Sequence, residues 1–164
     1  MRNVAAAPLN RAFLARWASI PLRLIVGYGF MAHGVLKLGR GVEVFAAALS
    51  GLGIPAPVVM AWATVLIELL GGLAVLLGAY IDFASVPMTV VLLVAMLKVH
   101  LAFGFSSIKF LAVTAAGPQF GKLGIECDLL YLACLATLVA GGPGPWAIDG
   151  WRRRFTGMRA YAPV

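Results

Sequence analysis

The sequence predicts an all-α membrane protein, a four-transmembrane-helix bundle, on the strength of its composition and of the way its apolar residues are grouped. Of the 164 residues, 62% are hydrophobic and only 12% are charged, whereas soluble domains carry about 25% charged residues. The apolar residues gather in four blocks, each near the length of about 20 residues that a helix needs to cross a hydrocarbon core. A membrane β-barrel would instead show strict alternation of apolar and polar residues.

The four blocks cover about residues 20–38, 58–80, 84–103 and 127–140. Only residues 81–83 join the second block to the third, so these two helices are expected to form a tight antiparallel hairpin. We therefore predict one transmembrane domain over residues 1–151 and a basic cytoplasmic C-terminal tail over residues 152–164.

The two longer connections are predicted to contain short interfacial or re-entrant segments. Residues 39–57 include four apolar positions at helical spacing, Val42, Phe45, Ala46 and Leu49. A Gly-Ile-Pro-Ala-Pro run follows them and cannot continue a helix. Residues 104–125 are too long and too apolar for a plain solvated loop, and Gly117-Pro118 interrupts them. Both segments are expected to lie near the membrane surface.

The basic residues predict the orientation in the membrane. Eight of them lie on the side of the chain termini: Arg2, Arg11, Arg16, Arg23, Arg152, Arg153, Arg154 and Arg159. Only four lie on the opposite side of the predicted bundle. The positive-inside rule then places both termini in the cytoplasm, in a bacterial-type cytoplasmic (inner) membrane. The net charge of +7 is explained by this topology and by attraction to the lipid bilayer, so no nucleic-acid partner is predicted.

A single carboxylate, Glu68, lies within the second apolar block and is followed by Gly71 and Gly72. A charge in hydrocarbon is costly unless it is paired, protonated or beside a polar cavity. A cation of the first block, Arg23 or Lys37, is the expected partner. Two interpretations remain open, a structural ion pair and a protonatable group beside a cavity.

One face of the first block carries two cations and two glycines, because offsets of 4, 7, 11 and 14 return close to the same helical angle: Arg23, Gly27, Phe30, Gly34 and Lys37. The glycines allow another helix to approach closely. Such faces are also compatible with self-association into a homo-oligomer. Alternatively, both cations extend toward opposite headgroup regions.

His100 and Glu126 complete the set of candidate site residues. Imidazole transfers protons near neutral pH, although a single interfacial histidine is more often structural. Glu126 and Asp128 flank Cys127 at the start of the fourth block, where the helix dipole accounts for acidic residues. Only His33 is available as a second histidine and no CxxC pair occurs, so no metal site is predicted.

Taken together, these residues resemble the DoxX family of small four-helix membrane proteins, over about residues 16–149. The resemblance rests on the order and spacing of six groups: Arg23 with Gly34 and Lys37, Gly53-Ile54-Pro55, Glu68 with Gly71-Gly72 and Gly78, His100, Gly124 with Glu126, and Gly142-Pro143-Gly144 with Ile148-Asp149. The family usually has a serine before its terminal aspartate, whereas this chain has Trp146-Ala147-Ile148-Asp149.

The resemblance implies a membrane subunit of a redox assembly that binds quinone, because the family takes its name from a subunit associated with thiosulfate:quinone oxidoreductase. Partner proteins of the complex would hold any metal centre or sulfur substrate. By position, Glu68 and His100 are the expected catalytic residues, while Arg23, Lys37 and Glu126 are expected to bind the cofactor or an anion. The alternative is a non-enzymatic scaffold or small-solute carrier in which the charges only hold the helices together.

Overall fold

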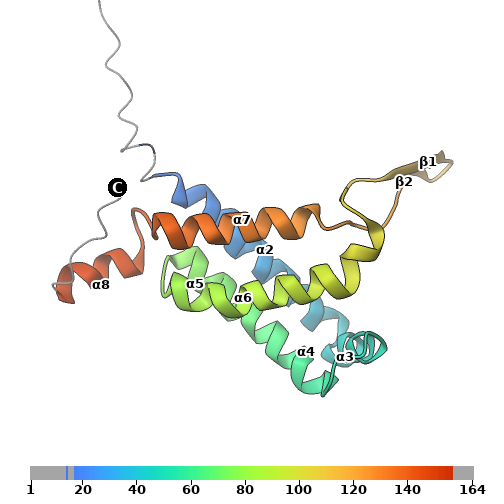
Figure 1. The fold of residues 1–164 in the computed structure, drawn as a ribbon, viewed down its shortest axis with the longest axis horizontal. Helices are drawn as coiled ribbons and strands as arrows, with labels where there is room; N and C mark the ends of the chain where they lie inside the picture. The colour runs from blue at the N-terminus through green and yellow to red at the C-terminus, as the bar shows by residue number, and fades with distance from the viewer. Residues whose placement is uncertain (1–13, 15–16, 157–164) are drawn as a thin grey trace, which may run out of the picture.

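The structure is a computed structural model that describes residue 14 and residues 17–156. For residues 153–156 it describes the backbone only. Its long helices run back and forth between two ends of one bundle (Figure 1). Helix α8 lies at one end, and a β-hairpin projects at the other. The predicted helical membrane fold is therefore confirmed.

Helix α2, Ser19–Arg40, is the first long helix. Its buried positions recur every three or four residues, which is the period of one helical face: Ser19, Arg23, Val26, Gly27, Phe30 and Gly34. This is the predicted stripe, and it lies in the bundle interior. At Gly41 the chain turns with φ of 92°, a conformation suited to glycine, and continues as the short helix α3, Val42–Gly51.

The second long helix spans Pro57–Leu77 and has three parts. It begins as α4, Pro57–Leu66, widens into the π-helical segment η1, Ile67–Gly71, and ends as α5, Gly72–Leu77. Helix α3 packs beside α4, and its buried Val42, Ala46 and Leu49 confirm the amphipathic pattern read from the sequence.

The third long helix spans Ile81–Phe103. It consists of α6, Ile81–Ala95, the π-helical segment η2, Met96–His100, and the 3₁₀ turn η3, Leu101–Phe103. The turn that joins it to α5 covers residues 78–80 and not the predicted 81–83. Gly78 and Tyr80 adopt positive φ there, and the buried Ile81 already belongs to α6.

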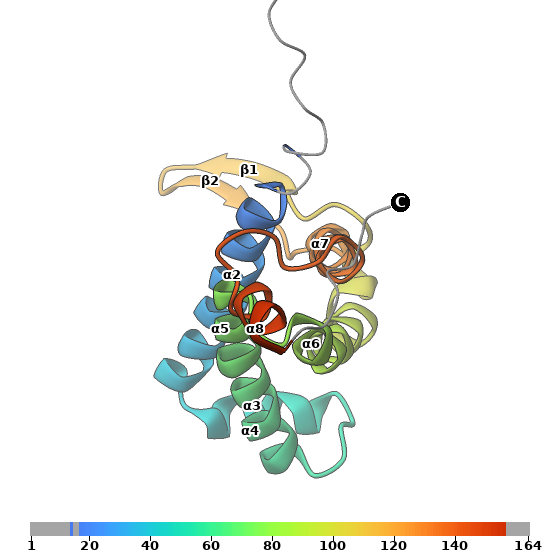
Figure 2. The ribbon, with the colours of Figure 1, turned by 90° about the vertical axis from the view of Figure 1, so that its left-hand side faces the viewer.

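Residues 104–125 contain a β-hairpin that the sequence did not predict. Strand β1, Phe110–Thr114, pairs antiparallel with β2, Gly117–Phe120. Every residue of β1 is exposed, and the hairpin extends away from the helices (Figures 1 and 2). Its location at the membrane surface stays a prediction.

The fourth long helix is α7, Glu126–Gly141, and α8 follows over Ile148–Thr156. In the described part of the chain, three helices are long and apolar enough to cross a membrane, and α7 with 16 residues is shorter, about 24 Å at 1.5 Å per residue. Helix α7 nevertheless packs along both α2 and α6 (Figure 2). Residues 152–156 of the predicted tail lie in α8, and residues 157–164 lie outside the described part.

The helices meet in an apolar core formed by α2, α5, α6 and α7. Its buried members come from all four helices: Val26, Phe30, Val75, Ile81, Ala84, Met88, Leu92, Leu135 and Leu138. Polar side chains buried among or beside these residues therefore have few partners available, and the partners that they do find define the candidate site.

Candidate functional site

Glu68 lies midway along the second long helix, within the π-helical segment η1, and only 4% of its surface is exposed. Its Oε1 atom pairs with the ammonium group of Lys37, which also lies 4.9 Å from the centroid of the Phe45 ring. A Cβ atom on Gly34 would lie 2.8 Å from Leu69, so glycine is what allows α2 to approach this closely. Of the two expected partners of Glu68, the structure selects Lys37.

The second oxygen of Glu68, Oε2, is buried and has no hydrogen-bond partner among the described residues. A buried carboxylate oxygen without a partner is costly, at about 1–3 kcal/mol. The ion pair therefore neutralises Glu68 but leaves one acceptor that a bound molecule or a proton could satisfy.

Arg23 lies at the other end of α2 and is buried. All five of its N–H groups donate to backbone carbonyl oxygens. Nε donates to Val75 and Nη2 to Leu76 at the end of α5, and the remaining bonds go to the segment before α8: Pro143, Pro145 and Trp146. The last carbonyls of a helix have no partners within it. Arg23 donates to Leu76 O, and it adds a second bond to Val75 O, which also accepts from Gly78 N.

Gly78 makes room for the Arg23 guanidinium. A Cβ atom there would lie 2.8 Å from Arg23 Cζ and 2.6 Å from Ala147 Cβ, and its φ of 66° favours glycine in any case. Asp149 closes the same region from α8, since its backbone N–H donates to Gly78 O at 3.0 Å and its carboxylate accepts from Ile81 N at 3.3 Å. Arg23 thus joins three segments of backbone, with no N–H group left for a ligand.

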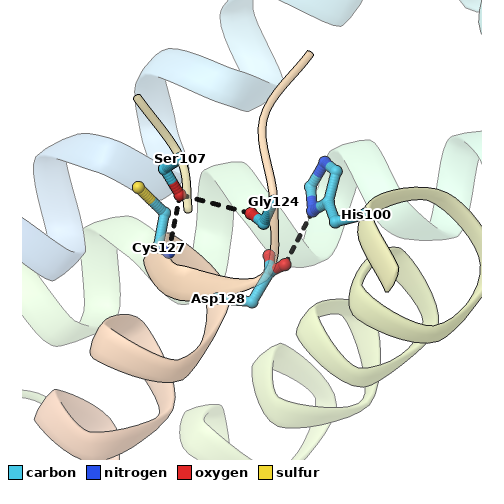
Figure 3. A network of polar contacts seen from close by, with 5 residues as sticks. All are labelled: His100, Ser107, Gly124, Cys127 and Asp128. Carbon is cyan, nitrogen blue, oxygen red and sulfur yellow. Dashed lines mark hydrogen bonds and ion pairs between the residues drawn. The ribbon is translucent and has the colours of Figure 1, made fainter. Parts of the chain in front are cut away.

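His100 ends the π-helical segment η2 and faces α7, where its Nδ1 atom lies 2.6 Å from Oδ2 of Asp128 (Figure 3). Asp128 is 5% exposed, and Lys98, two residues before His100, is exposed. A histidine whose one nitrogen is held by a carboxylate has a fixed ring orientation, with the second nitrogen available for proton transfer.

Residues Ser107 and Glu126 hold the start of α7 in place. The Glu126 carboxylate accepts from Ser107 N at 2.9 Å. Ser107 Oγ accepts from Cys127 N and donates to Gly124 O, both at 3.2 Å (Figure 3). Gly124 lies so close to the preceding segment that a Cβ atom would be 2.3 Å from Gly104 O. Glu126 therefore positions Asp128 through the backbone of α7.

A pocket of about 130 Å³ adjoins the His100 and Asp128 pair. Its walls are mostly apolar or aromatic, including Phe30, Leu92 and Tyr131. His33 and Cys127 also line it, although the sulfur of Cys127 points away from His100 (Figure 3). In the described residues, no three His, Cys, Asp or Glu side chains are grouped so that they hold a metal ion.

The five predicted site residues do not gather in one place. Lys37 and Glu68 meet between α2 and η1, Arg23 lies at the end that carries α8, and His100 and Glu126 lie at the start of α7. Their roles stay predictions. Both residues predicted to be catalytic, Glu68 and His100, lie in π-helical segments, which are rare and frequent at functional sites.

Sequence reasoning missed Asp128, which it attributed to the helix dipole. A signal was present, because Asp128 shares a helical face with Tyr131, Leu135 and Leu138 at offsets of 3, 7 and 10. Leu135 and Leu138 are buried in the core, so that face was bound to carry Asp128 inward with them.

Comparison with protein families gave one match. The model of the DoxX family matches residues 18–101, slightly more than half of the chain. The matched part contains Arg23, Lys37, Glu68 and His100, whereas Glu126 and Asp128 lie beyond it. The comparisons with curated proteins and with solved structures gave no match.

Proposed function

Because the chain belongs to the DoxX family of membrane proteins, we propose that it is a membrane subunit of a redox assembly that binds a quinone beside His100 and Asp128. The single observation that supports this proposal is the oriented His100 and Asp128 pair at the wall of an apolar pocket. A pocket of about 130 Å³ has room for about one six-membered ring, so in this proposal it holds the quinone ring and the apolar tail extends into the lipid.

Reduction of a quinone to a quinol takes two electrons and two protons. In this proposal His100 delivers one proton to a carbonyl oxygen of the head group, and solvent water supplies the second proton to the other carbonyl oxygen. Asp128 orients the imidazole and stabilises its charged form. The sequence contains no nucleotide or flavin fingerprint and no haem attachment motif, so the electrons come from a redox centre on a partner protein. The chain is thus not expected to be active alone.

The test is quinone binding by the protein extracted together with its native lipids. We expect quinone to copurify with the unaltered protein, and His100→Gln and Asp128→Asn each to weaken quinone binding at least about tenfold, the effect of losing one hydrogen bond to a charged group. Lys98→Gln is the matched control, because Lys98 is exposed and does not line the pocket. Absence of bound quinone, with no thermal shift on adding quinone to the purified protein, would contradict the proposal.

A second function is favoured by Arg23, whose five N–H groups all bind backbone carbonyls. This contact set, with the Lys37 and Glu68 pair, is what a non-enzymatic scaffold or a small-solute carrier would need to hold its helices together. Quinone binding by the unaltered protein distinguishes the two functions, because only the first requires it. Glu68→Gln tests the role of Glu68, which does not line the quinone pocket. A lower melting temperature with unchanged quinone binding assigns Glu68 to structure, whereas weaker quinone binding at an unchanged melting temperature assigns it to the redox site.

A further inference from the structure

A second and larger pocket, of about 320 Å³, lies between α2 and α3, away from the His100 and Asp128 pair. The two helices are separated by Gly41, where the chain turns with φ of 92° before α3 begins. His33 lines both pockets, but the carboxylates of Glu68 and Asp128 do not line this one.

The pocket presents positive charge on one side. Lys37 and Arg40 come from the last turn of α2, and His33 lies one turn before Lys37. The Lys37 charge is already neutralised by Glu68. The side chain of Arg40 makes no hydrogen bond or ion pair among the described residues, so its guanidinium is the group available to an anion.

The rest of the lining is mostly apolar, with Leu36 from α2 and Val44, Phe45 and Ala48 from α3. The pocket therefore combines one available guanidinium with a hydrocarbon surface. It also lies where the first long helix ends, and the ends of transmembrane helices lie at the depth of the lipid headgroups. An inorganic anion would use the guanidinium but leave the apolar walls uncovered.

We propose that this pocket binds one anionic phospholipid, with its phosphate on Arg40 and part of an acyl chain along Leu36, Val44 and Ala48. Guanidinium forms two parallel hydrogen bonds to a phosphate group, which favours arginine for this contact. The site is independent of the proposed quinone site, so either proposal can fail alone.

The experiment uses nanodiscs of phosphatidylcholine that contain a small fraction of phosphatidylglycerol, with bound lipid counted by native mass spectrometry. We expect the unaltered protein to retain phosphatidylglycerol in preference to phosphatidylcholine, and Arg40→Gln to reduce this preference about fivefold, the effect of one cation at a membrane surface. Ala48→Phe fills the pocket without changing charge and should reduce the preference as strongly. Lys98→Gln, an exposed cation outside the pocket, should leave it unchanged.

Four outcomes would overturn the assignment. The first is a full preference retained by Arg40→Gln. The second is an equal loss of preference in Lys98→Gln, which would show only a general effect of surface charge. The third is an increase in the melting temperature of the unaltered protein, but not of Arg40→Gln, when inorganic phosphate is added to nanodiscs of pure phosphatidylcholine. That result would assign the pocket to a soluble anion. The fourth is a full preference for phosphatidylglycerol in Ala48→Phe. This variant fills the pocket without changing charge, so that result would exclude the pocket as the lipid site.

Discussion

At the scale of single residues, the sequence places two arginines at opposite ends of α2, and the structure gives them opposite surroundings. Arg23 is buried and bonded by all five N–H groups to carbonyl oxygens of α5 and of the segment before α8. Arg40 is exposed and without a polar partner among the described residues. Both arginines lie near an end of the same helix. They differ because the Gly78 turn and residues 142–146 surround Arg23 only.

Removal of the Arg23 guanidinium is therefore expected to affect stability first. Arg23→Gln leaves several buried carbonyl oxygens without a donor and should lower the free energy of unfolding by about 3 kcal/mol. Arg40→Gln is the matched control and should change it by less than about 0.5 kcal/mol. Thermal unfolding in detergent micelles measures both variants. A stable Arg23→Gln protein that has lost ligand binding would instead support the cofactor-binding role predicted from the sequence.

At the scale of elements, the contact between α2 and α5 is made by two glycines facing one another. A Cβ atom on Gly72 would lie 2.8 Å from the carbonyl oxygen of Gly27, and one on Gly27 would lie 2.7 Å from the carbonyl oxygen of Gly72. Small residues at such crossings let helix backbones pack closely in a membrane, where the hydrophobic effect does not drive helices together.

Substitution at this crossing should push α2 and α5 apart. We expect Gly72→Ala to lower the free energy of unfolding by about 3 kcal/mol, because the new methyl group meets backbone that cannot move aside. Gly39→Ala is the control in the same pair of helices. A Cβ atom at Gly39 meets nothing within 4 Å, and alanine favours a helix by about 0.5 kcal/mol or more. Equal melting temperatures of the two variants would contradict the close contact.

The elements also show how far the sequence could lead. Apolar length predicted the long helices, and the spacing of Val42, Ala46 and Leu49 predicted α3, because both follow from local periodicity. The β-hairpin was not predicted, since its strands are short and exposed on both faces and so carry no alternating pattern. The pairing of His100 with Asp128 depends on how α6 and α7 pack, which no local pattern contains.

At the scale of the whole molecule, the charges are divided between the two ends of the bundle. Among the described residues, three arginines belong to α8, Arg152, Arg153 and Arg154, and Lys109 and Lys122 flank the hairpin at the other end. No acidic residue lies between Gly104 and Ile125. The positive-inside rule therefore predicts that the α8 end faces the cytoplasm and that the hairpin faces the opposite side.

Labelling of a single cysteine at the hairpin turn tests this orientation. In a Cys127→Ser and Cys134→Ser background, we expect Ala115→Cys to react with a membrane-impermeant maleimide added outside intact spheroplasts. A cysteine placed at Gly157 is the control and should react only after the membrane is permeabilised. The reverse pattern of labelling would show that the chain is inserted the other way round.

The π-helical segment η1 has a consequence for the length of the chain. A π turn holds one residue more than an α turn, because its hydrogen bonds join residues five apart. Deletion of the exposed Leu70 could therefore be absorbed by η1 tightening into an α-helix, with the residues on either side keeping their faces. Deletion of Val59 in the regular α4 would rotate one flank by about 100° relative to the other. Deletion of one residue beside Glu68 is therefore expected to preserve the fold. What it should change is the position of the Glu68 carboxylate.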